Sequence, residues 1–328
     1  MDETLIAVAA ANGGYLLRSQ LLDLAVNDDA IRVLVRAGHL RRIRHGTYVP
    51  AVLWDGASAS ERHAVAARSV VDKLGPGVVA THQSAAALHG LDLWGVDLSA
   101  VHVTRLDGRN GRSEAGVVFH SGRLDEADCV EVDGRLVSSA RRTVLETSAA
   151  EGIEPAVVLL SSALRRGAVV KDELEESIER DFARWQGIRS ARVAVRLADG
   201  RLETVGEARS LFMMWAHGIP APELQVEIVD GDGRVIARTD FAWSGYQHVG
   251  EFDGMLKYGR LNPFSDDPGR QLEREKVRED KVRATGRGMT RWTWHELDAR
   301  RSADTARRLH RDLEASRRLY GRAATHIV

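Results

Sequence analysis

Three carboxylates in the C-terminal third of the sequence interrupt apolar runs. The stretch "TDFAWSGYQHVGEFDG", residues 239 to 254, places Asp240, Glu251 and Asp253 among Phe, Trp and Val side chains. A charge in apolar surroundings is costly unless something compensates for it. Carboxylate oxygens are also the ligands that Mg²⁺ and Mn²⁺ prefer. Two interpretations follow from these residues: a solvated acidic sheet face, or oxygen ligands converging on a divalent cation.

Strand periodicity favours convergence. The segments "VIARTDFAW" and "HVGEFDG" predict consecutive strands joined by the turn "SGYQ". Side chains alternate along a strand, so Glu251 and Asp253 share one face and Phe252 points to the other. An antiparallel partner strand then puts Asp240 opposite the Glu251/Asp253 pair. Like charges so close repel, and without a cation at least one carboxyl should hold its proton. We therefore expect Asp240, Glu251 and Asp253 to bind Mg²⁺ or Mn²⁺.

The neighbouring segments predict the elements that position these carboxylates. A helix that begins at Glu207 and stops before Pro220 precedes the strand "LQVEIVD". The helix "GRQLEREKVREDKVRATG" and the strand "MTRWTWHEL" follow the acidic stretch. The order helix, three-strand meander, helix, strand predicts an α/β sandwich over residues 199–328. Glu207 is placed to complete the set of metal ligands.

This order of elements resembles the PD-(D/E)XK nuclease superfamily. The resemblance puts Glu207 on the first helix, Asp240 at the first strand position and Glu251 at the second. Asp253 stands where the common motif has lysine. The segment "EFDGMLKYG" is more similar to the subgroup related to very-short-patch-repair endonucleases, where Glu-x-Asp-Gly is followed by a basic residue. Lys257 occupies that basic position.

The resemblance implies metal-dependent hydrolysis of DNA phosphodiesters, that is, a deoxyribonuclease. A bound metal would polarise the phosphate and activate a water, and Lys257 or Arg291 would stabilise the developing charge. The alternatives are an acidic outer sheet face and a degenerate nuclease fold kept for interaction, because a fold alone does not establish activity. The implied catalytic residues are Asp240, Glu251, Asp253, Lys257, Glu207 and Arg291.

The first 55 residues predict a winged helix-turn-helix. Three short helical segments, the last between Asn27 and Gly38, are followed by "HLRRIRHGTYVPA", which predicts a hairpin around His45. From Arg32 to Arg44 there are five arginines and no acid. Such a stripe suits phosphate contacts. The alternative is a small helical module with a solvated arginine face. The predicted DNA-contacting residues are Arg32, Arg36, Arg41, Arg42, Arg44 and His45.

The stretch "GGYLLRSQLLDLAVNDDAIRVLVRAGHLRRIRHGTYVP" closely resembles the N-terminal domain of AbiEi-type antitoxins of type IV toxin–antitoxin systems. The paired glycines and the "GHLRRIRHGTYVP" ending carry the resemblance. In that family the domain binds operator DNA and represses its own operon. The resemblance implies DNA and a cognate toxin protein as partners, and transcriptional regulation as the function.

Residues 56–198 predict an α+β scaffold or interaction region. Residues 59 to 93 have a helical pattern, residues 100 to 137 a strand pattern, and residues 138 to 197 predict helices with breaks near three glycines. Five histidines in this region show no metal-ligand spacing and are interpreted as core or surface residues. They are His63, His82, His89, His102 and His120.

The composition limits the function classes. With 328 residues, 44% hydrophobic and 28% charged, the chain is expected to fold into two or three globular domains. Its net charge of -1 excludes a globally basic nucleic-acid coat but allows local basic patches. Cys129 is the single cysteine, so no disulfide forms within the chain and a cytoplasmic location is expected. The N-terminus lacks the basic start of a signal peptide, and no apolar run reaches the ~20 residues that span a membrane.

Taken together, the sequence predicts a mixed α/β (α+β) protein. A winged helix-turn-helix, an α+β middle region and a restriction-endonuclease-like α/β sandwich follow one another. The favoured function is a DNA-binding protein with a metal-dependent endonuclease domain. The alternatives are a non-catalytic antitoxin and transcriptional autorepressor, and a transcription factor with a sensor domain. A homodimer would suit a palindromic operator, although no coiled-coil heptads are visible.

Overall fold

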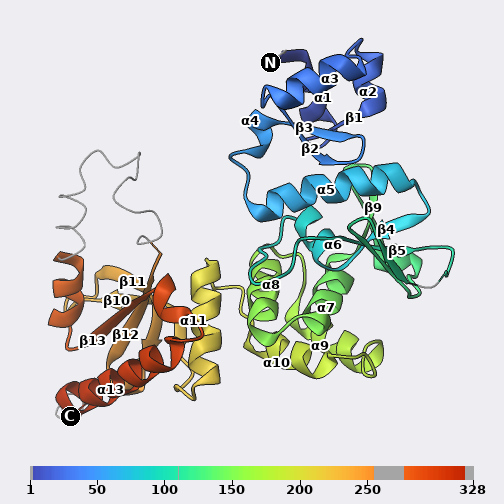
Figure 1. The fold of residues 1–328 in the computed structure, drawn as a ribbon. Helices are drawn as coiled ribbons and strands as arrows, with labels where there is room; N and C mark the ends of the chain where they lie inside the picture. Colours follow the sequence, from blue (N-terminus) through green and yellow to red (C-terminus); the bar gives the residue numbers. More distant parts are fainter. Residues whose placement is uncertain (1–2, 110, 255–276, 322–328) are drawn as a thin grey trace. The chain divides into compact units, whose positions relative to one another are not determined.

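The computed structural model describes residues 3–109, 111–254 and 277–321. The chain forms two compact units (Figure 1). The first consists of Met1–Ala163 and Gly167–Val195, and the second of Leu164–Arg166 and Arg196–Val328. Each unit combines helices with β-sheet, so the mixed α/β class is confirmed. The finer three-way division into domains stays a prediction.

The first unit begins with a winged helix. Strands β1, β3 and β2 form an antiparallel sheet in that order, and β2 and β3 make the predicted hairpin. Leu5, Leu21 and Ile31, one from each helix, are buried in one core with Leu16 and Leu40. The elements are α1 (Glu3–Ala11), β1 (Leu16–Leu17), α2 (Arg18–Asp23), α3 (Asp28–Arg36), β2 (Leu40–Arg44) and β3 (Thr47–Pro50).

The middle of the first unit is built on a six-stranded sheet in the order β6-β7-β5-β4-β9-β8. Two of its pairings, β5 with β7 and β4 with β9, are parallel. The elements are α4 (Ala51–Trp54), α5 (Ala59–Leu74), β4 (Val78–Ala80), α6 (His82–Leu88), β5 (Val101–Arg105), β6 (Arg112–Glu114), β7 (Val117–His120), β8 (Cys129–Val132) and β9 (Arg135–Ser138).

The prediction of an unbroken helical region over residues 59 to 93 is wrong at β4. Val78–Ala80 is a strand that pairs with β5 on one side and β9 on the other. All of its residues are buried, so no polar alternation marked it as a strand. The strand pattern over residues 100 to 137 is confirmed by strands β5 to β9.

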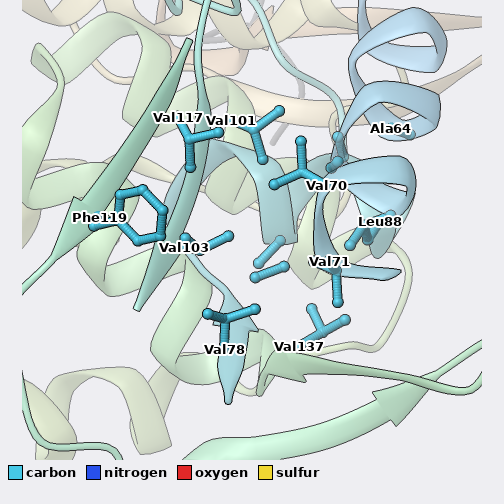
Figure 2. Packing of buried hydrophobic residues seen from close by; sticks show 14 residues of the cluster. Ala64, Val70, Val71, Val78, Leu88, Val101, Val103, Val117, Phe119 and Val137 are labelled. Atoms are coloured by element: carbon cyan, nitrogen blue, oxygen red, sulfur yellow. The ribbon is translucent and has the colours of Figure 1, made fainter. Parts of the chain in front are cut away.

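Four helices complete the first unit and confirm the predicted helical stretch with its breaks. They are α7 (Ala140–Ala150), α8 (Ile153–Arg165), α9 (Lys171–Arg180) and α10 (Ile188–Leu197). The core beside the six-stranded sheet is aliphatic: Val70 and Val71 of α5 pack with Val103 of β5 and Phe119 of β7 (Figure 2). This core buries one face of β5 and β7 and leaves the alternate residues of these strands on the other face.

The winged helix is fastened to the middle region by polar contacts. Tyr15 donates a hydrogen bond to Asp72 of α5, and the guanidinium of Arg135 binds both oxygens of Asp72 at 2.7 Å. Burial and the bond to Asp72 raise the pKa of Tyr15 to about 12. At the wing, Arg44 donates to the carbonyls of Ala115 and Gly116, at 2.6 and 3.1 Å. The two predicted N-terminal domains therefore share one compact unit.

The second unit is built on a four-stranded sheet in the order β10-β11-β12-β13. The first three strands are antiparallel, and β13 runs parallel to β12. Residues 277–284 are helical and lead into β13. The remaining elements are α11 (Val205–Ala216), β10 (Glu223–Val229), β11 (Val235–Trp243), β12 (His248–Asp253), β13 (Gly288–Thr293) and α13 (Ser302–Tyr320).

Helices α11 and α13 pack on the sheet through specific hydrogen bonds. Trp292 of β13 donates to Ser210 of α11 at 2.7 Å, and His248 of β12 bonds Ser316 of α13 at 2.8 Å. Val249, on the other face of β12, shares a buried cluster with Val282 from the 277–284 helix. The predicted first helix and the meander are present, and the second predicted helix is confirmed over residues 277–284, its earlier part lying outside the described residues. The late strand ends at Thr293, because Trp294–Leu297 forms a 3-10 helix. Helix α13 was missing from the prediction.

Candidate carboxylate site and nucleic-acid interface

A row of polar residues crosses strands β11, β12 and β13. Phe241 pairs with Gly250, so the preceding Asp240 lies opposite Glu251 in the antiparallel register. Glu251 in turn pairs with Arg291 of the parallel strand β13. The alternation inferred from the sequence therefore brings Asp240 and Glu251 together, and Arg291 stands beside them.

Asp240 is the carboxyl whose protonation the site alters most. It is largely buried, and burial together with the nearby charges of Glu207, Glu251 and Glu203 raises its pKa to about 7. One of its oxygens accepts a hydrogen bond of 2.8 Å from the backbone N–H of Phe252. This bond opposes the shift but does not cancel it. Near neutral pH the site thus contains a carboxyl that a cation or a proton can neutralise.

Glu251 is buried, with 8% of its surface exposed. Its Oε2 accepts a bond of 2.6 Å from Arg278 and lies 3.2 Å from Nε of Arg291. Its Oε1 is buried and has no hydrogen-bond partner among the described residues. A buried carboxylate oxygen without a partner is unusual and calls for a donor or a cation. One oxygen of Glu251 is therefore available, and the other is held by arginines.

Glu207, the predicted ligand from the helix, has a different role. Its carboxylate accepts bonds from the hydroxyl of Thr204 and the backbone N–H of Glu203, both at 2.8 Å, and from the amide of Gln225 at 2.9 Å. Thr204 in return caps the N–H of Glu207. Gln225 has a φ of 55°, which is uncommon for a non-glycine residue. These contacts make Glu207 a capping group that fixes the start of α11 against β10.

The remaining predicted residues are less closely gathered. Asp253 ends β12, half-buried, and pairs with Thr293. Lys257 lies outside the described residues. Among the described residues, one group of side chains has ligand atoms that all lie within 4.8 Å of one another, and it consists of histidines of the first unit. The described carboxylates of the second unit do not form such a group.

The donor set therefore fits a divalent cation in part. Asp240 and Oε1 of Glu251 offer oxygen atoms that suit Mg²⁺ or Mn²⁺. Arg278 and Arg291 bind the other oxygen of Glu251 and would compete with a cation. Glu207 lies near enough to Asp240 to raise its pKa, and both of its oxygens accept hydrogen bonds that hold the start of α11.

The predicted arginine stripe lies on α3 and β2 of the winged helix. Asn27 caps α3, its side chain accepting from the N–H of Ala30 at 2.9 Å. Asp28 and Asp29, which would repel phosphate, are each paired: Asp28 with Arg18 and Asp29 with Arg32. The acids at the helix start are thus locally neutralised.

The members of the stripe differ in what already binds them. Arg41 forms an ion pair with Asp55 at 2.9 Å, and Arg44 bonds the two carbonyls before β7. Burial lowers the pKa of Arg44. Arg36 is exposed at the end of α3, and Arg42 is exposed on the wing, 3.1 Å from the ring of His45. Arg36, Arg42 and His45 are therefore the basic residues best placed to meet a phosphate backbone.

Comparison with known proteins adds two findings. Residues 3–51 match a family model described as "Transcriptional regulator, AbiEi antitoxin". Two proteins of Mycobacterium tuberculosis, "Uncharacterized protein MT2308" of strain CDC 1551 and "Uncharacterized protein Rv2248" of strain H37Rv, are 31% identical to this chain over 225 residues. The matched region covers 68% of this chain and 77% of each relative. The chain belongs to the family of these mycobacterial proteins.

The resemblance of the N-terminal domain to AbiEi antitoxins is thereby supported over residues 3–51, whose matching family model is described as a transcriptional regulator. This match does not include the second unit. Among the helices of the described ranges, none is long and apolar enough to cross a membrane.

The first unit also contains a histidine cluster that the sequence analysis did not predict. His82 begins α6, His102 lies in β5 and His120 ends β7. The rings of His82 and His120 stack with centroids 3.8 Å apart, and His120 Nε2 lies 2.9 Å from His102 Nδ1. A sequence signal existed: His102 and His120 alternate with the buried valines of their strands and so share a face. The parallel pairing of β5 with β7 was not predictable from spacing.

Proposed function

We propose that the protein is a DNA-binding transcriptional regulator of the AbiEi antitoxin type, with α3 and the β2–β3 wing as the DNA-contacting surface. The match of residues 3–51 to the AbiEi antitoxin model is the observation that carries this proposal. The winged-helix topology supports it, because such domains place the last helix of the trio in the major groove. A cytoplasmic location and a cognate toxin partner belong to the same proposal.

Within this surface, Arg36 and Arg42 are assigned to phosphate contact. Both are exposed, whereas Arg41 is held by Asp55 and Arg44 by the carbonyls before β7. Arg32 is on the exposed face of α3 but pairs with Asp29. Contact through the outer end of α3 and the wing avoids the acidic first turn of the helix.

The test is the salt dependence of binding to a duplex taken from upstream of the protein's own gene. Fluorescence anisotropy would compare the wild type with Arg36→Ala, Arg42→Ala and the control Arg307→Ala, an exposed arginine on α13 of the second unit. Removing a phosphate contact should lower the slope of log affinity against log salt by about 1. Unchanged slopes in both α3 and wing variants would contradict the assignment. Light scattering on the same samples would show whether a dimer binds.

The toxin partner is tested separately. Co-expression with the product of an adjacent gene that arrests growth should restore growth if this chain is its antitoxin. The Arg36→Ala variant should retain this rescue while losing repression. The substitution removes a DNA contact, and neutralisation of the toxin is not expected to depend on that contact. Rescue by neither protein would leave transcriptional regulation as the proposed role without the antitoxin part.

A second candidate function is metal-dependent cleavage of DNA by the second unit. The observation that favours it is the pairing of Asp240, with its raised pKa, and Glu251, with its unpartnered Oε1, beside Arg291. Asp240 and Glu251 would hold Mg²⁺ or Mn²⁺, which supplies a water of lowered pKa near the phosphate. Arg291 and Arg278 would bind phosphate oxygens once Glu251 turned toward the cation. Asp253 and Lys257 remain proposed members of the site.

Cleavage of plasmid and single-stranded DNA in Mn²⁺ tests this second function. The wild type would be compared with Asp240→Ala, Glu251→Ala and Asp232→Ala, the last an exposed acid in the turn between β10 and β11. A nuclease loses cleavage in the first two variants and keeps it in the third. No cleavage by any protein, with DNA binding intact, would leave the second unit as a non-catalytic fold.

A further inference from the structure

The histidine cluster of the first unit has features of a binding site. Its three imidazoles come from elements 18 to 38 residues apart in the sequence, and each offers a nitrogen within 4.8 Å of the others. The rings are half-buried and so remain within reach of solvent. His82 adopts a φ of 52°, a left-handed conformation that a non-glycine residue seldom adopts without a compensating contact.

Polar atoms around the cluster lack partners. Nδ1 of His82 is buried without a hydrogen bond among the described residues and lies 3.5 Å from Oε2 of Glu146. Oε1 of Gln83 is likewise buried and unpartnered, while its amide nitrogen bonds Nε2 of His102 at 2.9 Å. Such atoms normally acquire partners in a folded protein. Their position around three imidazoles indicates an arrangement completed by a ligand.

We propose that His82, His102 and His120 bind a divalent transition-metal ion of the Zn²⁺ class. Neutral imidazole is the commonest protein ligand of Zn²⁺, and three histidines leave a coordination position for water. The cluster contains no carboxylate ligand and is therefore unlike the oxygen-rich sites that select Mg²⁺.

The nitrogens lie near the separations that such an ion requires, and the rings must reorient to bind it. Tetrahedral bonds of about 2.1 Å place neighbouring nitrogens roughly 3.4 Å apart. The 2.9 Å between His120 Nε2 and His102 Nδ1 is shorter than this, and one nitrogen from each of the three rings lies within 4.8 Å of the others. A metal lies in the plane of each ring that binds it, so His82 and His120 must turn out of their stacked arrangement. Binding of the ion would also replace the hydrogen bond between His120 Nε2 and His102 Nδ1.

A carboxylate outside the three rings is placed to orient one of them. Glu146 stands behind His82, where it can accept from Nδ1–H and leave Nε2 for the ion, as carboxylates commonly do behind metal-bound histidine. Glu146 is itself held by Arg142 at 2.6 Å, and Arg142 by Asp128 at 3.1 Å.

Titration of the full-length, metal-free chain with Zn²⁺ by isothermal calorimetry tests the site, with Co²⁺ absorption as a second readout. The wild type should bind one tight equivalent and show the intense visible bands of four-coordinate Co²⁺. His102→Gln and His120→Gln should each weaken binding at least tenfold, and Glu146→Gln by about 10- to 100-fold. The control His310→Gln, an exposed histidine of α13, should leave affinity unchanged.

Circular dichroism melting of each variant separates loss of the site from loss of the fold. A folded His102→Gln or His120→Gln protein with wild-type Zn²⁺ affinity would overturn the proposal, and so would a folded wild type without tight binding. If one variant does not fold, the other decides. The readout uses neither DNA nor cleavage, so its outcome is independent of both proposed functions.

Discussion

The carboxylate row of the second unit and the histidine cluster of the first are two candidate metal-binding regions. The sequence predicts the first of them and does not predict the second. Asp240 and Glu251 lie on strands joined by a short turn, so alternation and antiparallel pairing were enough to place them together. The histidines come from a helix start and two strands whose pairing is parallel. Parallel strands require a crossover whose course a local pattern does not reveal. Residues that a hairpin brings together can be predicted from the sequence, whereas residues that a crossover between parallel strands brings together cannot.

The two regions also differ in how their charges are compensated. Glu251 is bound by the side chains of Arg278 and Arg291, one from a helix and one from the adjacent strand. Beside His82 lies the buried chain of ion pairs Asp128–Arg142–Glu146, and Asp97 acts on His102 from another side. A cation bound by the row would have to compete with these arginines, whereas a cation bound by the proposed histidine site would not displace Arg142 from its carboxylates.

The largest expected effect concerns the support of the histidine cluster. Glu146→Ala leaves Asp128 as the one described carboxylate paired with the buried Arg142, and removing one partner of a buried ion pair costs about 3–5 kcal/mol. The free energy of unfolding in urea should fall by that amount. Glu131→Ala, an exposed acid on β8, is the control and should change it by about 0.5 kcal/mol or less. A loss below about 1 kcal/mol would show that Glu146 does not anchor the cluster.

A second prediction concerns the pH dependence contributed by Asp240. Its folded pKa is about 7, above the 3.8 of the unfolded chain, so the folded state holds the proton more tightly. Without divalent ions, this carboxyl lowers stability progressively as the pH rises from 3.8 to about 7. Asp240→Asn removes the penalty and should be about 2 kcal/mol more stable than the wild type near pH ~8, roughly half of what the full shift would give for a completely buried group.

Denaturation at several pH values checks this, and the two proteins should have similar stability near pH ~4. Adding Mn²⁺ should stabilise the wild type at high pH and leave Asp240→Asn unaffected if the row binds the ion. Equal pH profiles for the two proteins would mean that Asp240 is ionised in the fold at little cost.

Some parts of the fold and of the candidate sites could be predicted from the sequence, and others could not. The winged helix, the β10–β12 meander and the pairing of Asp240 with Glu251 follow from caps, turns and alternation. The capping role of Glu207 was not predictable, because it depends on Gln225 reaching it from another strand. Nor was the docking of Arg44 on the carbonyls before β7, which needs the tertiary fold. Strand β4 was missed because three buried residues show no period.

The third prediction tests the opposite pH dependence in the histidine cluster. The pKa of His102 falls from 6.5 to about 4 on folding, so its neutral form is the one the fold favours. Its contribution is fully present above 6.5 and is lost as the pH falls toward 4. His102→Gln should therefore remove a loss of stability that occurs as the pH falls from 6.5 to about 4, whereas Asp240→Asn removes a loss that occurs as the pH rises from 3.8 to about 7. Zn²⁺ should steepen the acid dependence of the wild type, because protons compete for the same nitrogens. If the free energy of unfolding of His102→Gln falls with decreasing pH as steeply as that of the wild type, other groups cause the fall.

The smallest expected effect discriminates most sharply between a metal site and a structural ion pair in the carboxylate row. Arg278 is partly exposed, so Arg278→Ala should cost less than about 1 kcal/mol of stability. The substitution leaves Glu251 with Arg291 alone and removes a cation that competes for its oxygen. If the row binds Mn²⁺, affinity should rise severalfold in this variant, and Arg283→Ala, in the same helix but paired with Glu279, should not change it. If affinity does not rise, the arginines are the permanent partners of Glu251. The row would then resemble a metal site only in its residue types.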